Sequence, residues 1–220
     1  MGPALWRLLQ TTDSFFPTGA FSHSGGLEGL TSERLLAGAE DAERAIEDIL
    51  VRSFALVDLP ACGLAHRAAG EVDRLLEIDA WVDSLKAPRE AREAGRSLGR
   101  RRLKVVTAPE AYRIAVEAGR SPGQQAVVTG MHAALEGVSR EEAMTAFAYG
   151  TAAGLVASAM KLLPLGQTRA QALLSRLGES MSESVRTADA LSLDELGSFT
   201  PLLDIAAMRH ETAAPRLFIS

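Results

Sequence analysis

Apolar residues recur every three or four positions along nearly the whole chain, which is the spacing of an amphipathic helix. Polar and charged residues occupy most positions between them. The stretch from residue 41 to 60 is typical, with an apolar stripe made of Ile46, Ile49, Leu50, Phe54 and Val57. Residues 71–85 repeat the arrangement. The pattern predicts an all-α protein.

The ends of these helices are marked by residue types that start and stop helices. Ser139 and Glu142 have the spacing of a capping box. Prolines and glycines interrupt the apolar pattern at regular intervals, and we expect Pro60 to end a helix. No alternating run flanked by glycine indicates a hairpin. We therefore expect a single domain over residues 1–220, folded as a bundle of about eight to ten helices.

Residues 143–160 contain no charge and approach the length of a membrane-spanning helix. Thr, Ser, Ala and Gly make the stretch only weakly apolar, so we expect a helix buried in a protein core. Gly150, Gly154 and Ser158 recur every four residues and leave one helical face without bulk, which lets a second helix approach closely. That face suits either a helix crossing inside one subunit or a self-association seam between two copies, and the spacing does not choose between them.

The amino-acid composition excludes some classes of protein but does not identify a function. Hydrophobic residues make up 47% of the 220 residues, which is enough for a sizeable core. A net charge of −5 favours neither nucleic acid nor an anionic membrane as a partner. Cys62 is the single cysteine, which excludes an intrachain disulfide and suits a reducing compartment. The first 13 residues lack the apolar run of a signal peptide, so we expect a cytoplasmic protein.

Side chains that usually carry metal or nucleotide chemistry are scattered along the chain. The four histidines are His23, His66, His132 and His210, and none of their spacings places two metal ligands on one helical face. The sequence also lacks the glycine-rich phosphate-binding loop of nucleotide-binding proteins. We expect neither a metal site nor a nucleotide site in this chain.

The segment SFFPTGAFSHSGGLE, residues 14–28, is the strongest candidate for chemistry. Ser22, His23 and Ser24 offer two hydroxyls and an imidazole, so a small helical hydrolase is one interpretation. Residues adjacent in sequence rarely point as a nucleophile and its base must, and the GxSxG pattern is absent. The simpler interpretation is a turn in which these side chains hydrogen-bond to the backbone. We expect no catalytic residue and keep the hydrolase as the alternative.

A basic run, AREAGRSLGRRRLK, lies in the middle of the chain. Arg92, Arg96 and Arg100 are four residues apart on one face of a predicted helix, and Arg101 and Arg102 continue the charge. A solvated helix face is the simplest interpretation, and an acidic protein partner is the alternative. Nucleic acid fits less well, because aromatic residues are not interleaved with the basic ones.

Three segments resemble the UreF-type urease accessory proteins. They are WRLLQTTDSFFPTGAFSHSGGLE near the start, AYGTAAGLVASAMKLLPLGQTRAQALL in the second half and PLLDIAAMRHETAAPRLFIS at the end. They match the family's opening motif, its long helix with the following Gly-Gln turn, and its closing motif, in the same order. Gln124 and Gln125 stand where many family members have a histidine, so no metal-handling role is carried over to them.

The resemblance implies a non-enzymatic all-α adaptor that forms a homodimer. Proteins of this family join a UreD/UreH-type scaffold protein and a UreG-type GTPase, and the complex delivers Ni²⁺ to apo-urease. The chain itself would need no cofactor, because the partner proteins would handle nickel and GTP.

The resemblance also implies partner-binding residues where this sequence matches the family motifs. The positions facing the GTPase are Lys161, Gln167 and Gln171, with Tyr149 nearby on the preceding helix and Trp6 as a weaker candidate. The opening motif contributes Phe21 and His23. The C-terminal tail, residues 201–220, would bind the scaffold protein through Arg209, His210, Glu211 and Arg216.

The tail has a physical argument of its own. Leu217, Phe218 and Ile219 are apolar, and a terminal segment has little to bury them against. We therefore expect the tail to be exposed for a partner, and its deletion after Pro201 to leave the helical fold in place. The alternative is a tail that packs on its own subunit.

Overall fold

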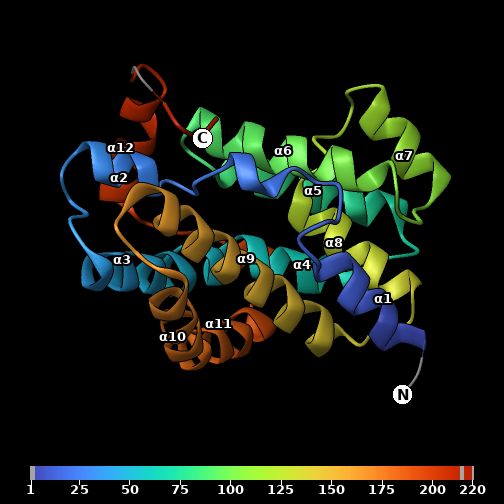
Figure 1. Ribbon diagram of the computed structural model, residues 1–220. Helices are drawn as coiled ribbons and strands as arrows, with labels where there is room; N and C mark the ends of the chain where they lie inside the picture. Colours follow the sequence, from blue (N-terminus) through green and yellow to red (C-terminus); the bar gives the residue numbers. More distant parts are fainter. Residues whose placement is uncertain (1–2, 214–215, 220) are drawn as a thin grey trace.

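A computed structural model describes residues 3–213 and 216–219 of the chain (Figure 1). The described residues form helices and no strand, which confirms the predicted all-α fold. The α-helices are α1 (Pro3–Thr12), α2 (Leu27–Ser32), α3 (Ala39–Arg52), α4 (Asp58–Arg67), α5 (Val72–Leu85), α6 (Arg89–Leu103), α7 (Glu110–Glu117), α8 (Gln125–Leu135), α9 (Arg140–Leu162), α10 (Gln167–Arg176), α11 (Gly178–Ala190) and α12 (Pro201–His210). Three short 3₁₀ turns are η1 (Ala20–Ser22), η2 (Phe54–Leu56) and η3 (Leu193–Glu195).

The twelve α-helices in the described part of the chain exceed the expected eight to ten because two apolar stretches are each divided into two helices. The first stretch breaks at η2, between α3 and α4, rather than at Pro60. Pro60 lies in the first turn of α4. Backbone N–H groups in the first turn have no partner within the helix, so the N–H that proline lacks is not needed there. The second break separates α10 from α11 at Leu177. By contrast, the capping box of Ser139 and Glu142 is present at the start of α9, as predicted.

Helices α4 and α8 form the centre of the bundle. Every residue from Leu59 to Ala65 of α4 is buried, so this helix is enclosed on all sides rather than amphipathic. Gly130 of α8 makes the closest approach, because a Cβ atom placed there would lie 1.9 Å from the carbonyl oxygen of Cys62. Burial raises the pKa of the Cys62 thiol to about 12, so this thiol is an inert packing group.

Two apolar clusters surround this centre. One is formed mainly by α3, α9, α10 and α11, and the other mainly by α4, α5, α7 and α8. Phe147 of α9 contacts both clusters, and its ring meets that of Phe54 edge to face at 5.0 Å between centroids. The long helix α9 therefore joins the two halves of the bundle (Figure 1).

A buried polar network ties the start of α8 to α5. Both oxygens of the Asp79 carboxylate accept backbone N–H groups, from Gly123 and Gln124, each at 2.7 Å. The fully buried Gln124 amide donates to Asp83 at 2.7 Å and accepts from Lys86 at 3.0 Å. Gln124 is therefore a structural residue in this chain.

Two helical stretches are long and apolar enough to cross a membrane by length and composition alone. They are residues 39–67, which include α3 and α4, and α9. Core helices pass the same test, and α9 indeed buries one face through Ala148, Ala152, Leu155, Val156 and Ala159. The expectation that residues 143–160 form a core helix is confirmed for this face.

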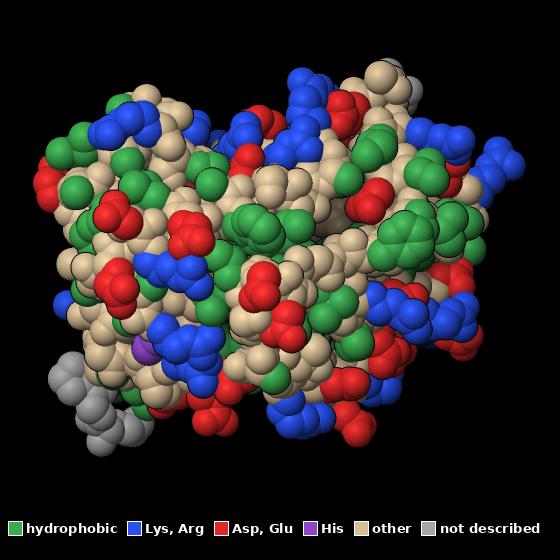
Figure 2. Space-filling view, turned by 180° about the vertical axis from the view of Figure 1, so that it is seen from behind, with side chains coloured by type: hydrophobic (Ala, Val, Ile, Leu, Met, Phe, Trp, Pro, Cys, Tyr) green, Lys and Arg blue, Asp and Glu red, His purple; other side chains and the backbone are tan. Residues whose placement is uncertain are grey.

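The surface carries charges of both signs. On the side opposite to that of Figure 1, acidic and basic side chains alternate, with hydrophobic side chains between them (Figure 2).

The C-terminal helix α12 packs on the short helix α2, so segments from the two ends of the chain lie side by side (Figure 1). This junction contains most of the residues that the sequence singled out.

Candidate functional site

The segment between α1 and α2 is an ordered loop shaped by glycine. Gly25 and Gly26 have φ angles of 63° and 93°, in the left-handed region that favours glycine. A Cβ atom at Gly25 would lie 2.7 Å from a side-chain atom of Leu155. The two glycines therefore turn the chain into α2 while the loop stays close to α9.

The Ser24 side chain and the backbone of Ser22 and His23 are bonded into this turn. The Ser24 hydroxyl is buried and accepts the backbone N–H of Glu28 at 3.3 Å. The carbonyl of Ser22 accepts the backbone N–H of Ile219 at 2.8 Å, and that of His23 accepts the Ser158 hydroxyl at 3.3 Å. Burial, followed by the charge of Arg101, lowers the pKa of His23. These contacts favour the structural interpretation of the segment over the hydrolase.

The opening and closing motifs of the chain meet in one buried ionic cluster. His210 is 3% exposed, and its Nε2 atom lies 2.9 Å from a carboxylate oxygen of Glu28. Its Nδ1 atom lies 2.7 Å from Glu90, at the start of α6, which also accepts from Arg216 at 2.7 Å. We refer to Glu28, Glu90, His210 and Arg216 as the terminal clasp.

Glu28 is the central residue of the terminal clasp. Its two oxygens accept the backbone N–H groups of Leu217 and Phe218 at 2.6 and 2.8 Å, in addition to the His210 contact. Burial by itself would raise the pKa of Glu28, but these two backbone donors and His210 lower it overall. The carboxylate therefore holds the final residues of the chain in its ionised form.

Lys161, at the end of α9, connects the loop to the tail. Its Nζ atom donates to the carbonyl of Phe21 at 3.2 Å and lies 5.0 Å from the centroid of the Phe218 ring. Such a cation–aromatic contact adds about 0.5–1 kcal/mol at an exposed site. Lys161, Phe21, His23 and the tail, predicted as partner-binding residues from separate motifs, are thus brought together.

The tail is packed more firmly than its sequence suggests. His210 and Phe218 are buried, and Ala206 of α12 belongs to the apolar core. The expectation of a tail with nothing to bury against is wrong for these residues, because α2 and α6 supply a surface for it. Leu217 and Ile219 remain exposed, as expected. Residues 214, 215 and 220 of the predicted tail lie outside the described residues.

The other two tail residues make ion pairs at the surface. Arg209 contacts Glu33 at 2.6 Å, and Glu211 contacts Arg89 at 3.2 Å. Exposed pairs of this kind contribute about 0–1 kcal/mol each. The Arg209 and Glu211 side chains can therefore leave these ion pairs and contact a partner protein.

The remaining predicted partner-binding residues lie on other surfaces. Trp6 on α1 is 65% exposed and Tyr149 on α9 is 48% exposed. Gln167 and Gln171 are exposed on α10. The structure therefore separates the predicted residues into the junction around the terminal clasp and exposed positions on α1, α9 and α10.

The small-residue face of α9 does not form a helix crossing inside the subunit. Nothing described lies within 4 Å of a Cβ atom placed at Gly154, and at Gly150 the nearest atom is the Thr12 methyl at 3.9 Å. Only Ser158 is buried, under the loop. Of the two alternatives that the sequence left open, the intrasubunit crossing is wrong for Gly154.

The basic run is mostly engaged with its own chain. Arg96 makes a bidentate pair with Asp83 at 2.6 and 2.7 Å, and Arg92 donates to backbone carbonyls. Arg102 is buried, with 7% of its surface exposed. The interpretation as a solvated helix face is therefore wrong for Arg102 and holds for the exposed Arg100 and Arg101.

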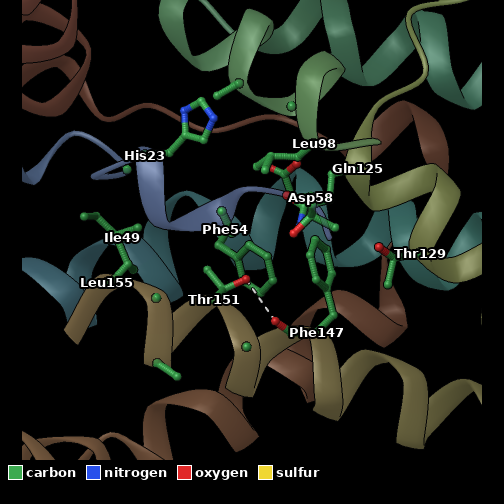
Figure 3. A pocket seen from close by; sticks show the side chains of 18 of the residues that line it. His23, Ile49, Phe54, Asp58, Leu98, Gln125, Thr129, Phe147, Thr151 and Leu155 are labelled. Carbon is green, nitrogen blue, oxygen red and sulfur yellow. Dashed lines mark hydrogen bonds between the residues drawn. The ribbon is translucent and has the colours of Figure 1, made fainter. Parts of the chain in front are cut away.

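A cavity of about 630 Å³ lies beneath the loop, between α6, α8 and α9. His23 lies at one end of its lining and Thr129 at the other, with the rings of Phe54 and Phe147 between them (Figure 3). Within the described ranges, no three His, Cys, Asp or Glu side chains are placed to hold a metal ion.

Sequence motifs did not identify Glu28 and Glu90 as functional residues, and Phe218, expected to be exposed with the rest of the tail, is buried. Glu28 is the last residue of the segment 14–28, so the sequence did contain a motif that points to it. Glu90 stands beside the basic run in the sequence, but its side chain contacts His210 in the tail, 120 residues away. No local pattern identifies such a distant pair.

Comparison with known proteins decides the family. The UreF family model matches residues 36–178. The chain is 31% identical to a urease accessory protein UreF from Bacillus sp. (strain TB-90) over 98% of this chain and 99% of that protein. The chain belongs to the UreF family.

Other relatives of this UreF-family chain agree with the assignment. The urease accessory protein UreF of Kocuria rhizophila is 34% identical over 98% of this chain and 97% of its own length. The urease accessory protein UreF of Haemophilus influenzae is 34% identical over 98% of this chain and 95% of its own length. These alignments cover 98% of this chain and so extend beyond the family model at both ends. The resemblance found in the sequence is confirmed.

Proposed function

We propose that this UreF-family chain is a non-enzymatic adaptor that joins a UreD/UreH-type scaffold protein and recruits a UreG-type GTPase for nickel insertion into apo-urease. It acts in the cytoplasm as a homodimer, and nickel and GTP are handled by its partners. The supporting observation is the terminal clasp, which holds the end of the chain in place and leaves apolar side chains beside it facing outward.

The scaffold protein binds the outer face of α12 and the tail. Leu202 is 69% exposed, and Ile205 and Met208 on the same helix are about half exposed. Leu217 and Ile219 of the tail are also exposed, on either side of the buried Phe218 in the sequence. Exposed apolar residues grouped in this way are typical of protein-binding surfaces. His210 contributes to the surface only indirectly, because its side chain is enclosed by Glu28 and Glu90.

The GTPase binds Lys161 at the junction and the exposed Gln167 and Gln171 on α10, and Tyr149 on α9 and Trp6 on α1 are further contact residues. Lys161 contacts both the loop and Phe218. The two partner surfaces therefore meet at this lysine. The open Gly150 and Gly154 face of α9 is the seam of the homodimer.

Co-expression with the two partners, followed by size-exclusion chromatography, tests this function. We expect a ternary complex with the unchanged chain. Lys161→Ala should weaken GTPase capture about tenfold, which corresponds to about 1.4 kcal/mol, and leave scaffold binding intact. Leu202→Asp should weaken scaffold binding and leave GTPase capture intact.

The matched control is Val105→Asp, which changes an exposed apolar residue outside both surfaces and should retain both partners. Absence of a ternary complex between folded partners contradicts the adaptor function. Equal loss of both partners in Lys161→Ala contradicts the separate assignment of the two surfaces.

A further inference from the structure

Three buried polar atoms of residues that line the cavity have no hydrogen-bond partner among the described residues. They are Arg102 Nε, Thr129 Oγ1 and His132 Nδ1. All three residues line the cavity, and each is more than nine-tenths buried. Buried polar atoms are almost always hydrogen-bonded in native proteins, so a shared set of three indicates a missing occupant.

Arg102 is a buried cation without a carboxylate. Its guanidinium lies 4.9 Å from the centroid of the Phe16 ring, and Nη2 donates to the carbonyl of Thr11 at 3.4 Å. None of the ion pairs between described residues involves it. Burial lowers the pKa of Arg102 to about 10. Keeping an unpaired charge in such a place costs several kcal/mol unless an anion is supplied.

The nearby acidic groups are already engaged. Glu136 contacts Arg7 at 3.3 Å and accepts from the Thr107 hydroxyl at 3.1 Å. Asp58 contacts Lys86 at 2.7 Å. The buried Cys62 thiol stays protonated at neutral pH. No described carboxylate forms an ion pair with Arg102, so an anion from outside the described residues can pair with it.

Helix α8 provides the rest of the site. Thr129 and His132 are three residues apart and so project from the same face of the helix. Burial, followed by the charge of Arg102, lowers the pKa of His132, so its ring is neutral at pH 7. Nδ1 has no partner among the described residues, and a neutral ring with its proton on the other nitrogen presents Nδ1 as an acceptor.

We propose that Arg102, Thr129 and His132 form a binding site for a small, singly charged oxyanion that carries a hydroxyl hydrogen. The oxyanion accepts a hydrogen bond from Arg102 Nε and donates its hydroxyl to His132 Nδ1. The Thr129 hydroxyl donates to a second oxygen. Water can satisfy the threonine and the histidine but does not neutralise the guanidinium. Hydrogencarbonate and dihydrogen phosphate have this chemistry, and the site is independent of the adaptor function proposed above.

Nitrogen-15 NMR of the histidine rings in the full chain provides a direct test. Hydrogencarbonate and, separately, dihydrogen phosphate are added at constant pH and ionic strength, with chloride as the reference salt. We expect at least one of them to shift the His132 ring resonances in a saturable manner. Formate has the same charge but no hydroxyl, and it should bind at least about tenfold more weakly, because it cannot donate to Nδ1.

Thermal unfolding of variants provides the second test. The oxyanion should raise the midpoint temperature of thermal unfolding of the unchanged chain, because it binds only the folded state. Arg102→Met should abolish this rise, while the exposed Arg186→Met should retain it. If Arg102→Met does not fold, Thr129→Val serves instead and should weaken binding. The proposal is overturned if chloride acts as strongly as both oxyanions, or if neither oxyanion changes the His132 resonances.

Discussion

At the scale of single residues, Glu28 connects the two ends of this UreF-family chain. One carboxylate receives two backbone N–H groups of the tail and the ring of His210. A protonated or amide side chain cannot accept at both oxygens in the same way. The conformation of the last residues therefore depends on the ionisation of this one group.

The pKa of Glu28 is lowered in the folded chain from an ordinary value of 4.5. Its contribution to stability is therefore complete above about pH 4.5 and is lost as the pH falls through the lower folded-state pKa. We expect the Leu217 and Phe218 amides to lose protection from hydrogen exchange over this acid range. Glu28→Gln should show reduced protection at pH 7, by about 1–3 kcal/mol, and little further change with acid. Unchanged protection of these amides in Glu28→Gln would show that the carboxylate is not what holds the tail.

At the scale of helices, two glycines of similar appearance in the sequence have opposite surroundings. Gly130 lies where α8 crosses α4, with the Cys62 carbonyl oxygen 1.9 Å from the position of an added Cβ atom. Gly154 lies on the open face of α9, where an added Cβ atom meets nothing within 4 Å. Helical periodicity predicts both helices, but only packing separates the two glycines.

Gly130→Ala should destabilise the chain by about 1–3 kcal/mol or more, because the two backbones must move apart. Gly154→Ala should stabilise the monomer by about 0.5–1 kcal/mol, because alanine favours the helix and no atom is displaced. Denaturant unfolding of the two variants measures both changes. Gly154→Leu, followed by light scattering, then tests the proposed seam: a dimer that persists unchanged would remove Gly154 from the interface.

At the scale of the whole molecule, the C-terminal segment is part of the fold. Helix α12 packs on α2, Ala206 lies in the core, and His210 and Phe218 are buried. The sequence suggested that this segment is dispensable for folding. That interpretation fails because it treated the tail by itself, whereas α2 and Glu90 provide its binding surface.

Deleting residues 201–220 should therefore lower the free energy of unfolding by about 3 kcal/mol or more, because it leaves Glu28 near the interior without its partners. Deleting only residues 211–220 keeps α12 and His210 and should cost less. Urea titration of both truncated chains, monitored by circular dichroism, measures the difference. An unchanged unfolding midpoint after removal of residues 201–220 would show that the tail is a binding segment alone.

The sequence by itself determined the helical class, the capping box of α9, the glycine-shaped loop and the family. These features depend on residues close together in the chain, where spacing and residue type are sufficient. Only the tertiary structure decided that His210 meets Glu28, that Phe218 is buried, and that Arg102 lies inside while Arg101 lies outside. Each of these depends on which helix faces come together across more than eighty residues, and local periodicity contains no information about that pairing.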